Sequence, residues 1–192
     1  MKETLKGTRS FDEFMDCLRN CVDITTWGQG GAKTVEDLWN EVLAGESGIV
    51  QERNGILRMT WPIFLNVLYI DQGTLFEMYE ARQIFREDGR ERIRDLPGSI
   101  GEKGTSKDKP EDVVRKAIKE ELDGKIPLSL ENSKVRLLRK WTEREIARSY
   151  PGLATQSNKV LFELNLMPNQ GYPKSFILQE SKKYTFFDWR IR

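Results

Sequence analysis

The chain of 192 residues carries 31 lysines and arginines against 30 aspartates and glutamates, so its formal net charge is +1. A charge this close to zero argues against a general attraction to nucleic acids or anionic membranes. The sequence contains no histidine, which excludes Ser-His and Cys-His catalysis and histidine-based zinc sites. Any enzymatic proton transfer would therefore depend on carboxylates, lysines or a metal-bound water.

The sequence also lacks the usual signals for membranes and secretion. No apolar run reaches the roughly 18 residues of a membrane span, and MKETLKGTRS at residues 1–10 lacks an apolar signal core. Cys17 and Cys21 are spaced to share a helix face, which suits packing better than a disulfide. We therefore expect an intracellular protein, cytoplasmic or organellar, in a reducing environment and without membrane contact.

Two helices are predicted near the N-terminus. Ser10 can cap a helix over residues 10–23, and Thr34 can cap a second helix in VEDLWNEVL, residues 35–43. The segment WGQGGAK between them lacks the spacing of a phosphate-binding loop and is interpreted as a turn. We expect residues 1–55 to form an N-terminal helical element that ends in a polar loop.

The rest of the chain is richer in strand-forming residues. The runs 56–70 and 75–85 are typical of strands joined by the turn DQGT, and Asp88-Gly89 predicts a further turn into RERIRDL. A glycine-rich connector, PGSIGEKGTSKDK, leads to a helix that Pro110 can begin. Three more strand-like runs follow, at residues 135–146, 158–167 and 183–191. This order predicts an α+β fold for residues 56–192, with helices packed on a mixed or antiparallel sheet.

The adjacent Glu120 and Glu121 stand out on the predicted helix. On a helical wheel of residues 113–122, Glu121 falls near the centre of the apolar stripe and Glu120 falls at its edge. A carboxylate in such a place must be paired, hydrogen-bonded, protonated or bound to a cation. The pair could hold Mg²⁺, which prefers oxygen ligands. Alternatively, Glu121 caps backbone amides or pairs with an arginine, for which Arg82 is a candidate.

The segment from Gly101 to Gly124 resembles a Nudix box, whose pattern is G-x5-E-x7-R-E-U-x-E-E-x-G-U with U aliphatic. When Glu120 and Glu121 are set on the paired glutamates of the motif, Ile118 matches its first aliphatic position. Several positions depart from the pattern: Lys116 replaces the arginine, Ala117 the glutamate after it, Asp108 the earlier glutamate and Glu102 the first glycine, and Asp123 holds the last glycine position, with Gly124 one place late.

Longer segments resemble a family of Nudix-like proteins from photosynthetic eukaryotes and protists, from about residue 24 onward. They are TTWGQGGAKTVEDLWNEVLAGES, YEARQIFREDGRERIRDLPGSIGEK, KAIKEELDG and SYPGLAT. The resemblance implies a Nudix-like mixed β-sheet with flanking helices and, in active members, Mg²⁺-dependent hydrolysis of diphosphate-linked substrates. It also implies Glu120 and Glu121 as metal ligands, Glu102 as a third candidate, and Mg²⁺ or Mn²⁺ as the cofactor.

Arginines in REDGRERIR alternate, so they would share one face of a strand. Their planar side chains suit phosphates, which makes Arg92 and Arg94, together with Arg82, candidate phosphate-binding residues. The alternative is a solvated hairpin edge whose charges oppose aggregation. The aromatic residues of the strand runs are interpreted as core, and no RNP-like segment is present, so nucleic acid is not an expected partner. They include Trp61, Trp141, Phe186, Phe187 and Trp189.

Two functions remain open, and only one of them is enzymatic. The missing carboxylate at Ala117 favours a protein that binds a diphosphate-containing ligand, or joins a protein assembly, with little or no turnover. A Mg²⁺-dependent hydrolase of nucleoside-diphosphate-type substrates is the alternative. A replacement carboxylate that reaches the site from Glu102, Glu143 or Glu163 would favour that alternative.

Overall fold

The computed structural model describes residues 10–53, 55–122, 124–126, 134–168 and 171–192. Contacts divide the chain into two compact units. Unit 1 comprises Met1–Pro62, Lys103–Asp108 and Trp141–Lys159, and unit 2 comprises Ile63–Glu102, Lys109–Lys140 and Val160–Arg192. Both units draw on segments that are far apart in the sequence.

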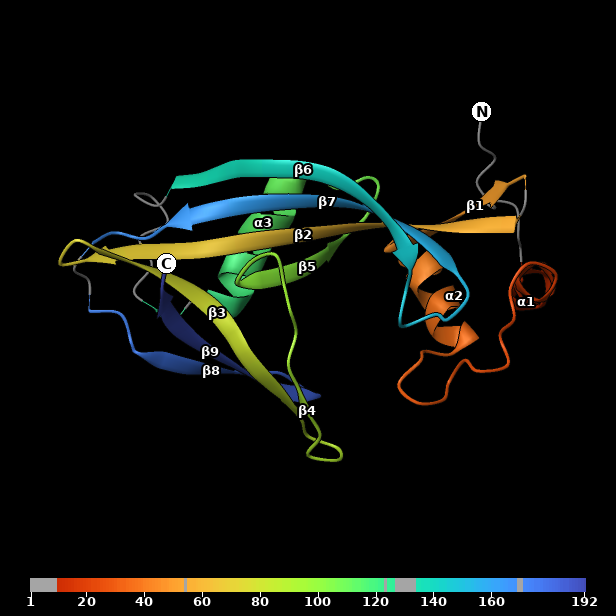
Figure 1. The fold of residues 1–192 in the computed structure, drawn as a ribbon, viewed down its shortest axis with the longest axis horizontal. Helices are drawn as coiled ribbons and strands as arrows, with labels where there is room; N and C mark the ends of the chain where they lie inside the picture. Colours follow the sequence, from red (N-terminus) through yellow and green to blue (C-terminus); the bar gives the residue numbers. More distant parts are fainter. Residues whose placement is uncertain (1–9, 54, 123, 127–133, 169–170) are drawn as a thin grey trace. The chain divides into compact units, whose positions relative to one another are not determined.

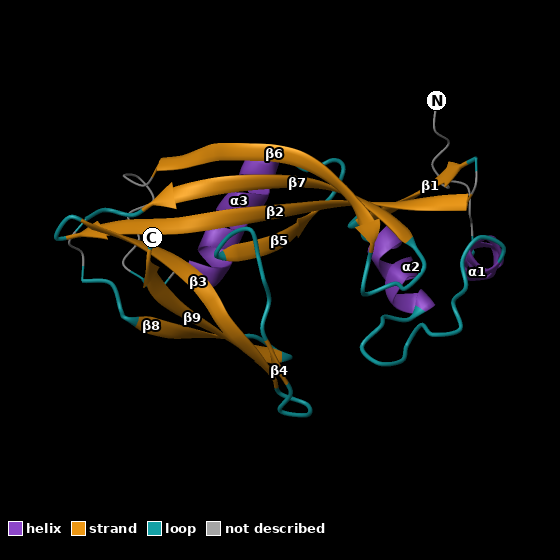
Figure 2. Cartoon of the chain, in the orientation of Figure 1, coloured by secondary structure: helices purple, strands orange, loops and turns teal. Residues whose placement is uncertain are grey.

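Nine strands in the described parts of the chain belong to one sheet (Figures 1 and 2). The main path runs in the order β6-β7-β2-β3-β9-β8, with β1 and β5 paired to β2 and β4 paired to β3. The strands are β1 (Ser47–Glu52), β2 (Gly55–Asp71), β3 (Thr74–Phe85), β4 (Glu91–Arg92), β5 (Ile100–Gly104), β6 (Lys134–Ile146), β7 (Ala154–Asn165), β8 (Ser175–Gln179) and β9 (Lys183–Ile191).

The described helices are few and short. They are α1 (Phe11–Arg19), α2 (Val35–Leu43), α3 (Pro110–Ala117) and a π-helical turn, η1 (Ile118–Leu122), that continues α3. None of them is long and apolar enough to cross a membrane. One sheet with a few separate helices confirms the predicted α+β class.

Both N-terminal caps are formed as predicted. The Ser10 side chain accepts a hydrogen bond from the backbone amide of Glu13 at the start of α1. Thr34 and Asp37 form a reciprocal capping box at the start of α2. The first helix is shorter than the predicted range 10–23, since Asn20 already caps its C-terminus. Cys17 and Cys21 are free and pack against the unit 1 core.

Unit 1 has its own apolar core, formed by α1, α2, β1, β2 and the turn at SYPGLAT. Leu38 and Tyr150 are fully buried in it, and the Trp27 indole donates a hydrogen bond to the Pro151 carbonyl at 2.9 Å. The Trp27 and Tyr150 rings lie 5.1 Å apart. These contacts attach the loop before α2 to the turn before β7.

A buried carboxylate lies beside this core and collects several partners. Glu41, 6% exposed, lies 2.5 Å from the Lys33 ammonium and 2.6 Å from the Arg58 guanidinium, and it accepts a hydrogen bond from Ser47 at 2.8 Å. Burial alone would raise the pKa of Glu41, but the hydrogen bond from Lys33 and the charge of Arg58 outweigh it and lower the pKa to about 2.

Unit 2 packs α3 and η1 against one face of the sheet (Figure 1). Ile63, Leu65 and Val67 alternate along β2 and point into this core, as the period of two in a strand requires. The α3 side contributes Val114, Ala117, Ile118 and Leu122, the stripe that the helical wheel predicts. Phe187 of β9 is 2% exposed in the same core.

Ser99 joins β2 and β3 where their direct pairing ends. The recorded register of the two strands runs only from Leu68↔Glu77 to Asp71↔Thr74. Beyond it, the Ser99 hydroxyl accepts a hydrogen bond from the Val67 amide at 3.0 Å and donates one to the Met78 carbonyl. One buried side chain therefore satisfies backbone groups of both strands, as buried polar groups require.

We expect Glu41→Gln to lower the free energy of unfolding by about 3 kcal/mol at pH 7, because it leaves Lys33 and Arg58 without their anion. Since the pKa of Glu41 is lowered on folding, its contribution should disappear as the pH falls from about 4 to about 2. Urea denaturation of both proteins between pH 2 and pH 7 measures this. Equal stability of the variant and the wild-type protein at pH 7 would contradict a central role for Glu41. The matched control is Glu36→Gln, on the exposed face of α2.

Candidate functional site

The helix that carries the paired glutamates ends in a π-helical turn. Pro110 occupies its first turn, as predicted, and Val114, Ala117, Ile118 and Leu122 hold it on the sheet. The π turn covers Ile118–Leu122 and therefore includes Glu120 and Glu121. Such turns are rare and occur frequently at functional sites. The two glutamates consequently have different surroundings.

Glu121 is partly buried, and Glu102 of β5 lies near enough to influence its protonation. Burial raises the pKa of Glu121, Glu102 raises it further, and Glu180 adds to the effect. Lys183 opposes these influences without cancelling them. Burial and the nearby carboxyl groups act in the same direction, because each of them disfavours the charged form of Glu121.

A β-bulge brings two more polar side chains to the same region. The register between β3 and β9 shifts between Glu80 and Arg82, so that Ala81 is an extra residue on β3. Because of this shift Glu80 and Gln83 are both buried and hydrogen-bonded to each other at 3.2 Å. Arg94 donates from Nε to Glu80 at 2.7 Å and makes a second, shorter bond from Nη2.

The chain of contacts continues onto β9. Gln83 reaches the Thr185 hydroxyl at 3.5 Å, and Thr185 donates to Glu180 at 3.0 Å. Lys183 lies 3.1 Å from Glu180. We call the eight residues of this arrangement the polar network: Glu80, Gln83, Arg94, Glu102, Glu121, Glu180, Lys183 and Thr185.

The polar network has more acidic groups than basic ones. Its four glutamates face two cations, Arg94 and Lys183, so full ionisation would leave a charge of 2 − 4 = −2. Burial alone would lower the pKa of Arg94, but the hydrogen bond to Glu80, with Glu121 and Glu180 nearby, raises it. A divalent cation would balance the excess, and a retained proton on Glu121 relieves part of it.

The predicted metal ligands are separated by the fold. Glu102 and Glu121 come together, whereas the Glu120 side chain is 58% exposed and lies 3.8 Å from Lys116 one turn earlier. That exposed pair is an ordinary i,i+4 contact on a helix surface. Glu120 is therefore outside the polar network.

The predicted arginines are also separated. Arg94 belongs to the polar network, and Arg92 lies opposite Gln83 in the β3–β4 register. Burial and repulsion by Arg94 lower the pKa of Arg92, against the attraction of Glu80. Arg82 contacts groups other than Glu121: its guanidinium lies 4.8 Å from the Phe186 ring centre and 3.9 Å from Glu91. The cation that acts on Glu121 from this hairpin is Arg94.

Only one of the three possible replacement carboxylates reaches the region. Glu163 is buried beside Arg136 at 2.7 Å and Asn165 at 3.0 Å, and Glu143 pairs with Lys159. Glu102 is the one that contacts Glu121.

The residues present suit one mode of magnesium binding. No group of three or more acidic or cysteine side chains in the described ranges could enclose a metal ion. Mg²⁺, however, is commonly held by one or two carboxylates together with water and substrate phosphates. The oxygen donors of Glu102 and Glu121 fit that mode, and the negative excess of the polar network favours it.

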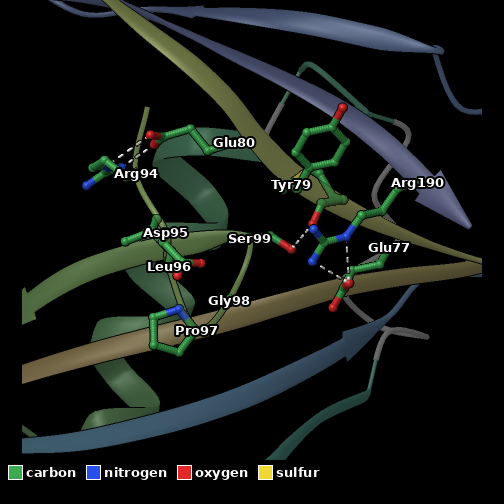
Figure 3. A pocket seen from close by; sticks show the side chains of 11 residues that line it. Glu77, Tyr79, Glu80, Arg94, Asp95, Leu96, Pro97, Gly98, Ser99 and Arg190 are labelled. Carbon is green, nitrogen blue, oxygen red and sulfur yellow. Dashed lines mark hydrogen bonds and ion pairs between the residues drawn. The ribbon is translucent and has the colours of Figure 1, made fainter. Parts of the chain in front are cut away.

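A pocket of about 90 Å³ lies beside Arg94, between β3, the segment before β5 and Arg190 of β9 (Figure 3). The Glu80–Arg94 pair lies at one end of it and the Glu77–Arg190 pair at the other. Its lining residues are Glu77, Met78, Tyr79, Glu80, Arg94, Asp95, Leu96, Pro97, Gly98, Ser99 and Arg190. Arg94 thus contacts both this pocket and the polar network.

Sequence reasoning did not identify Glu80, Gln83, Glu180, Lys183 or Thr185. Each of the first two falls in a strand-like run, YEARQ, in which strict alternation would send them to opposite faces. Only the bulge at Ala81 aligns them, and no sequence rule fixes its position. A signal was present in the glutamate and glutamine of a strand that also carries large apolar residues, since polar residues must find partners when they are buried.

Comparison with models of protein families and with curated proteins finds no match to this chain.

We expect Glu121→Gln to flatten the pH dependence of stability. Between the ordinary glutamate pKa of about 4.3 and the raised value of about 8, the unfolded carboxyl is ionised while the folded one keeps its proton. The free energy of unfolding of the wild-type protein should therefore fall as pH rises through this window, by roughly 2–4 kcal/mol. Chemical denaturation at pH 5 and pH 8 measures it, with exposed Glu120→Gln as the control. A wild-type protein equally stable at both pH values would refute the assignment.

We expect Arg94→Gln to cost about 3–5 kcal/mol of stability, since it leaves the buried Glu80 carboxylate without its cation. The matched change Arg82→Gln removes an exposed arginine from the same hairpin and should cost less than about 1 kcal/mol. Urea denaturation midpoints of the two variants compare them directly. Similar losses of stability in both variants would show that the Glu80–Arg94 contact contributes no more than an exposed arginine does.

Proposed function

We propose that this protein binds a diphosphate-containing ligand through a divalent cation, Mg²⁺ or Mn²⁺, with Glu102 and Glu121 as the carboxylates that hold the cation. The observation that carries the proposal is the proximity of Glu102 to the partly buried Glu121, whose pKa it raises, in a network with an acidic excess. A bound cation would supply positive charge against the oxygens of the diphosphate.

Neighbouring arginines support a phosphate-containing ligand. Arg94 is held by Glu80, so its position is fixed beside the glutamate pair. Arg92 lies next to it, and the lowered pKa of Arg92 reflects burial and the repulsion among these arginines. An anion between them would reduce that repulsion, and the planar guanidinium groups match phosphate oxygens. In this role the two arginines orient the ligand and the glutamates retain the cation.

Binding with little turnover is favoured over hydrolysis by Ala117. This residue is 2% exposed in the unit 2 core, where its methyl group packs with apolar neighbours. In the resembling motif a glutamate stands at this position. A small apolar residue there removes one carboxylate that the chemistry would use as a ligand or base, at a cost of several orders of magnitude in rate.

Hydrolysis of a diphosphate-linked substrate is the second candidate, and the position of Glu102 favours it. Glu102 contacts Glu121 and thus restores the number of carboxylates in the region. The raised pKa of Glu121 also suits a general base near neutral pH, because a base is most effective when its pKa lies close to the working pH. In this role Glu121 would accept a proton from the attacking water.

The test combines binding and turnover on the same samples. Titration calorimetry measures Mg²⁺ or Mn²⁺ binding in the presence of a non-hydrolysable diphosphate, and phosphate-release assays follow a panel of diphosphate-linked substrates. We expect cation-dependent ligand binding that is at least about 10-fold weaker in Glu121→Gln and Glu102→Gln. Even residues that only orient metal ligands contribute about 10–100-fold in affinity. Glu120→Gln, one residue away and exposed, should bind like the wild-type protein.

The outcomes separate the two functions. Cation-dependent binding without turnover supports the ligand-binding role, and turnover that disappears in Glu121→Gln supports the hydrolase. Absence of cation binding at millimolar concentration, with all variants folded, would refute both. An equal loss of binding in Glu120→Gln would show that any carboxylate at the end of the helix can hold the cation. That result would contradict the assignment to Glu121.

A further inference from the structure

The last strand on one side of the sheet contains no charged residue. The main path of the described strands ends at β6 on one side and at β8 on the other, and Figure 1 shows β8 at the margin of the strands of unit 2. Charges and prolines within an edge strand oppose pairing with another chain. The thirteen residues of β6 include seven charged ones, whereas the five residues of β8, SFILQ, include neither a charge nor a proline.

The side chains of β8 are apolar on both faces of the sheet. Phe176 and Leu178 pack against the unit 2 core, where Phe176 stacks on Phe187 at 5.1 Å. Ile177 points to the other face, is 49% exposed and stands opposite Phe186 of β9. The sequence-based prediction that Phe186 belongs to the core is therefore not met, since its neighbour Phe187 is the buried one.

The backbone of β8 has a free edge, which is the side that faces away from β9. The Glu180 amide donates to the Lys183 carbonyl at 2.9 Å, so Glu180 directs its backbone groups at β9. Successive residues of an antiparallel strand face alternate neighbours, so Phe176 and Leu178 face β9 as well. The remaining residues of the strand face the free edge, beyond which no described strand lies: Ser175, Ile177 and Gln179.

From this edge we propose that two copies of the chain pair through β8, antiparallel, about a two-fold axis at Ile177. In this register Ile177 faces its own copy and Ser175 faces Gln179, so the residues that point to the free edge satisfy one another's backbone groups. Phe176 of one copy stands opposite Leu178 of the other, which joins their apolar side chains. The contact uses the same surface of both copies, so it closes at two and does not extend into a fibre.

Charge complementarity at the two ends of β8 supports a second copy as the partner. The register that centres on Ile177 sets Lys174 of each copy opposite Glu180 of the other. The segment KSFILQE is therefore complementary to itself when it is read in opposite directions. Opposite charges across an antiparallel pair stabilise the pairing. A register moved by two residues would set Lys174 opposite Leu178 instead and lose this contact.

The second copy would also add a cation to the polar network. Glu180 belongs to that network, in which four glutamates face two cations. Lys174 of the other copy would change the balance at full ionisation from −2 to 3 − 4 = −1. An extended segment without a lysine at this position would offer the same backbone pairing without that gain. The inference does not depend on cation binding by Glu102 and Glu121.

Sedimentation velocity of the full chain between about 5 and about 300 µM tests the proposal. Two five-residue strands bury less than the roughly 1,200–2,000 Å² of stable interfaces, so we expect a weak dimer with a dissociation constant on the order of 10–100 µM. Ile177→Lys sets two like charges at the axis and should raise this constant at least about 10-fold. Lys174→Glu sets like charges at both ends and should raise it by about 10-fold.

Two variants provide matched controls for these substitutions. Ile191→Lys changes an isoleucine that is 71% exposed at the end of β9, and Lys107→Glu changes an exposed lysine in the loop before α3. Both should dimerise as the wild-type protein does. An equal loss in either control would overturn the proposal in favour of a general effect of charge.

Amide hydrogen exchange resolved by residue gives an independent measurement on the wild-type protein, which decides even if Ile177→Lys fails to fold. Raising the concentration from about 20 to about 300 µM should slow exchange at Ser175, Ile177 and Gln179. The amides of Phe176 and Leu178, which already face β9, should not change. A dimer without this alternation, or one that persists in Ile177→Lys, would overturn the proposal. A monomer at 300 µM would overturn it as well and would leave the edge to an extended segment of another protein.

Discussion

The Glu80–Arg94 pair is the contact on which the rest of unit 2 depends. Glu80 is buried, so a cation must reach it, and Arg94 provides one from the segment after β4. The pair holds that segment along β3. Ser99, further along the same segment, then hydrogen-bonds to the backbone of both β2 and β3. The chain then enters β5, which pairs with β2 and carries Glu102 to Glu121. One buried carboxylate thus determines how the candidate site is assembled.

Features that depend on neighbours in the sequence were predictable, and features that depend on distant contacts were not. The caps at Ser10 and Thr34 and the helix start at Pro110 follow from local chemistry. The strands β1, β5 and β8 have only five or six residues each, too few for a clear pattern, and pairing with β2 or β9 makes them strands. The meeting of Glu102 with Glu121 is likewise decided by strand pairing, which local pattern does not encode.

The segments that carry the resemblance to Nudix-like proteins differ in what they do here. Two of these segments meet in unit 1, namely TTWGQGGAKTVEDLWNEVL and SYPGLAT. There the Trp27 indole donates a hydrogen bond to the Pro151 carbonyl, and the Lys33 backbone amide donates one to the Ser149 carbonyl. Their physical role is to build a core around Tyr150 and to surround Glu41 with cations. The paired-glutamate segment lies in unit 2 instead. The first group therefore contributes to the core of unit 1, and the paired-glutamate segment belongs to the candidate site.

The interleaving of the two units has a consequence for how the protein can be dissected. The polypeptide passes from one unit to the other after residues 62, 102, 108, 140 and 159, and four of these crossings fall inside strands, namely β2, β5, β6 and β7. No single cut in the chain releases either unit as a continuous fragment. Truncation cannot isolate the segment around Glu121, because it would sever strands that both cores share. Fragments of the chain should aggregate or remain unfolded, and function has to be assigned through point substitutions in the intact chain.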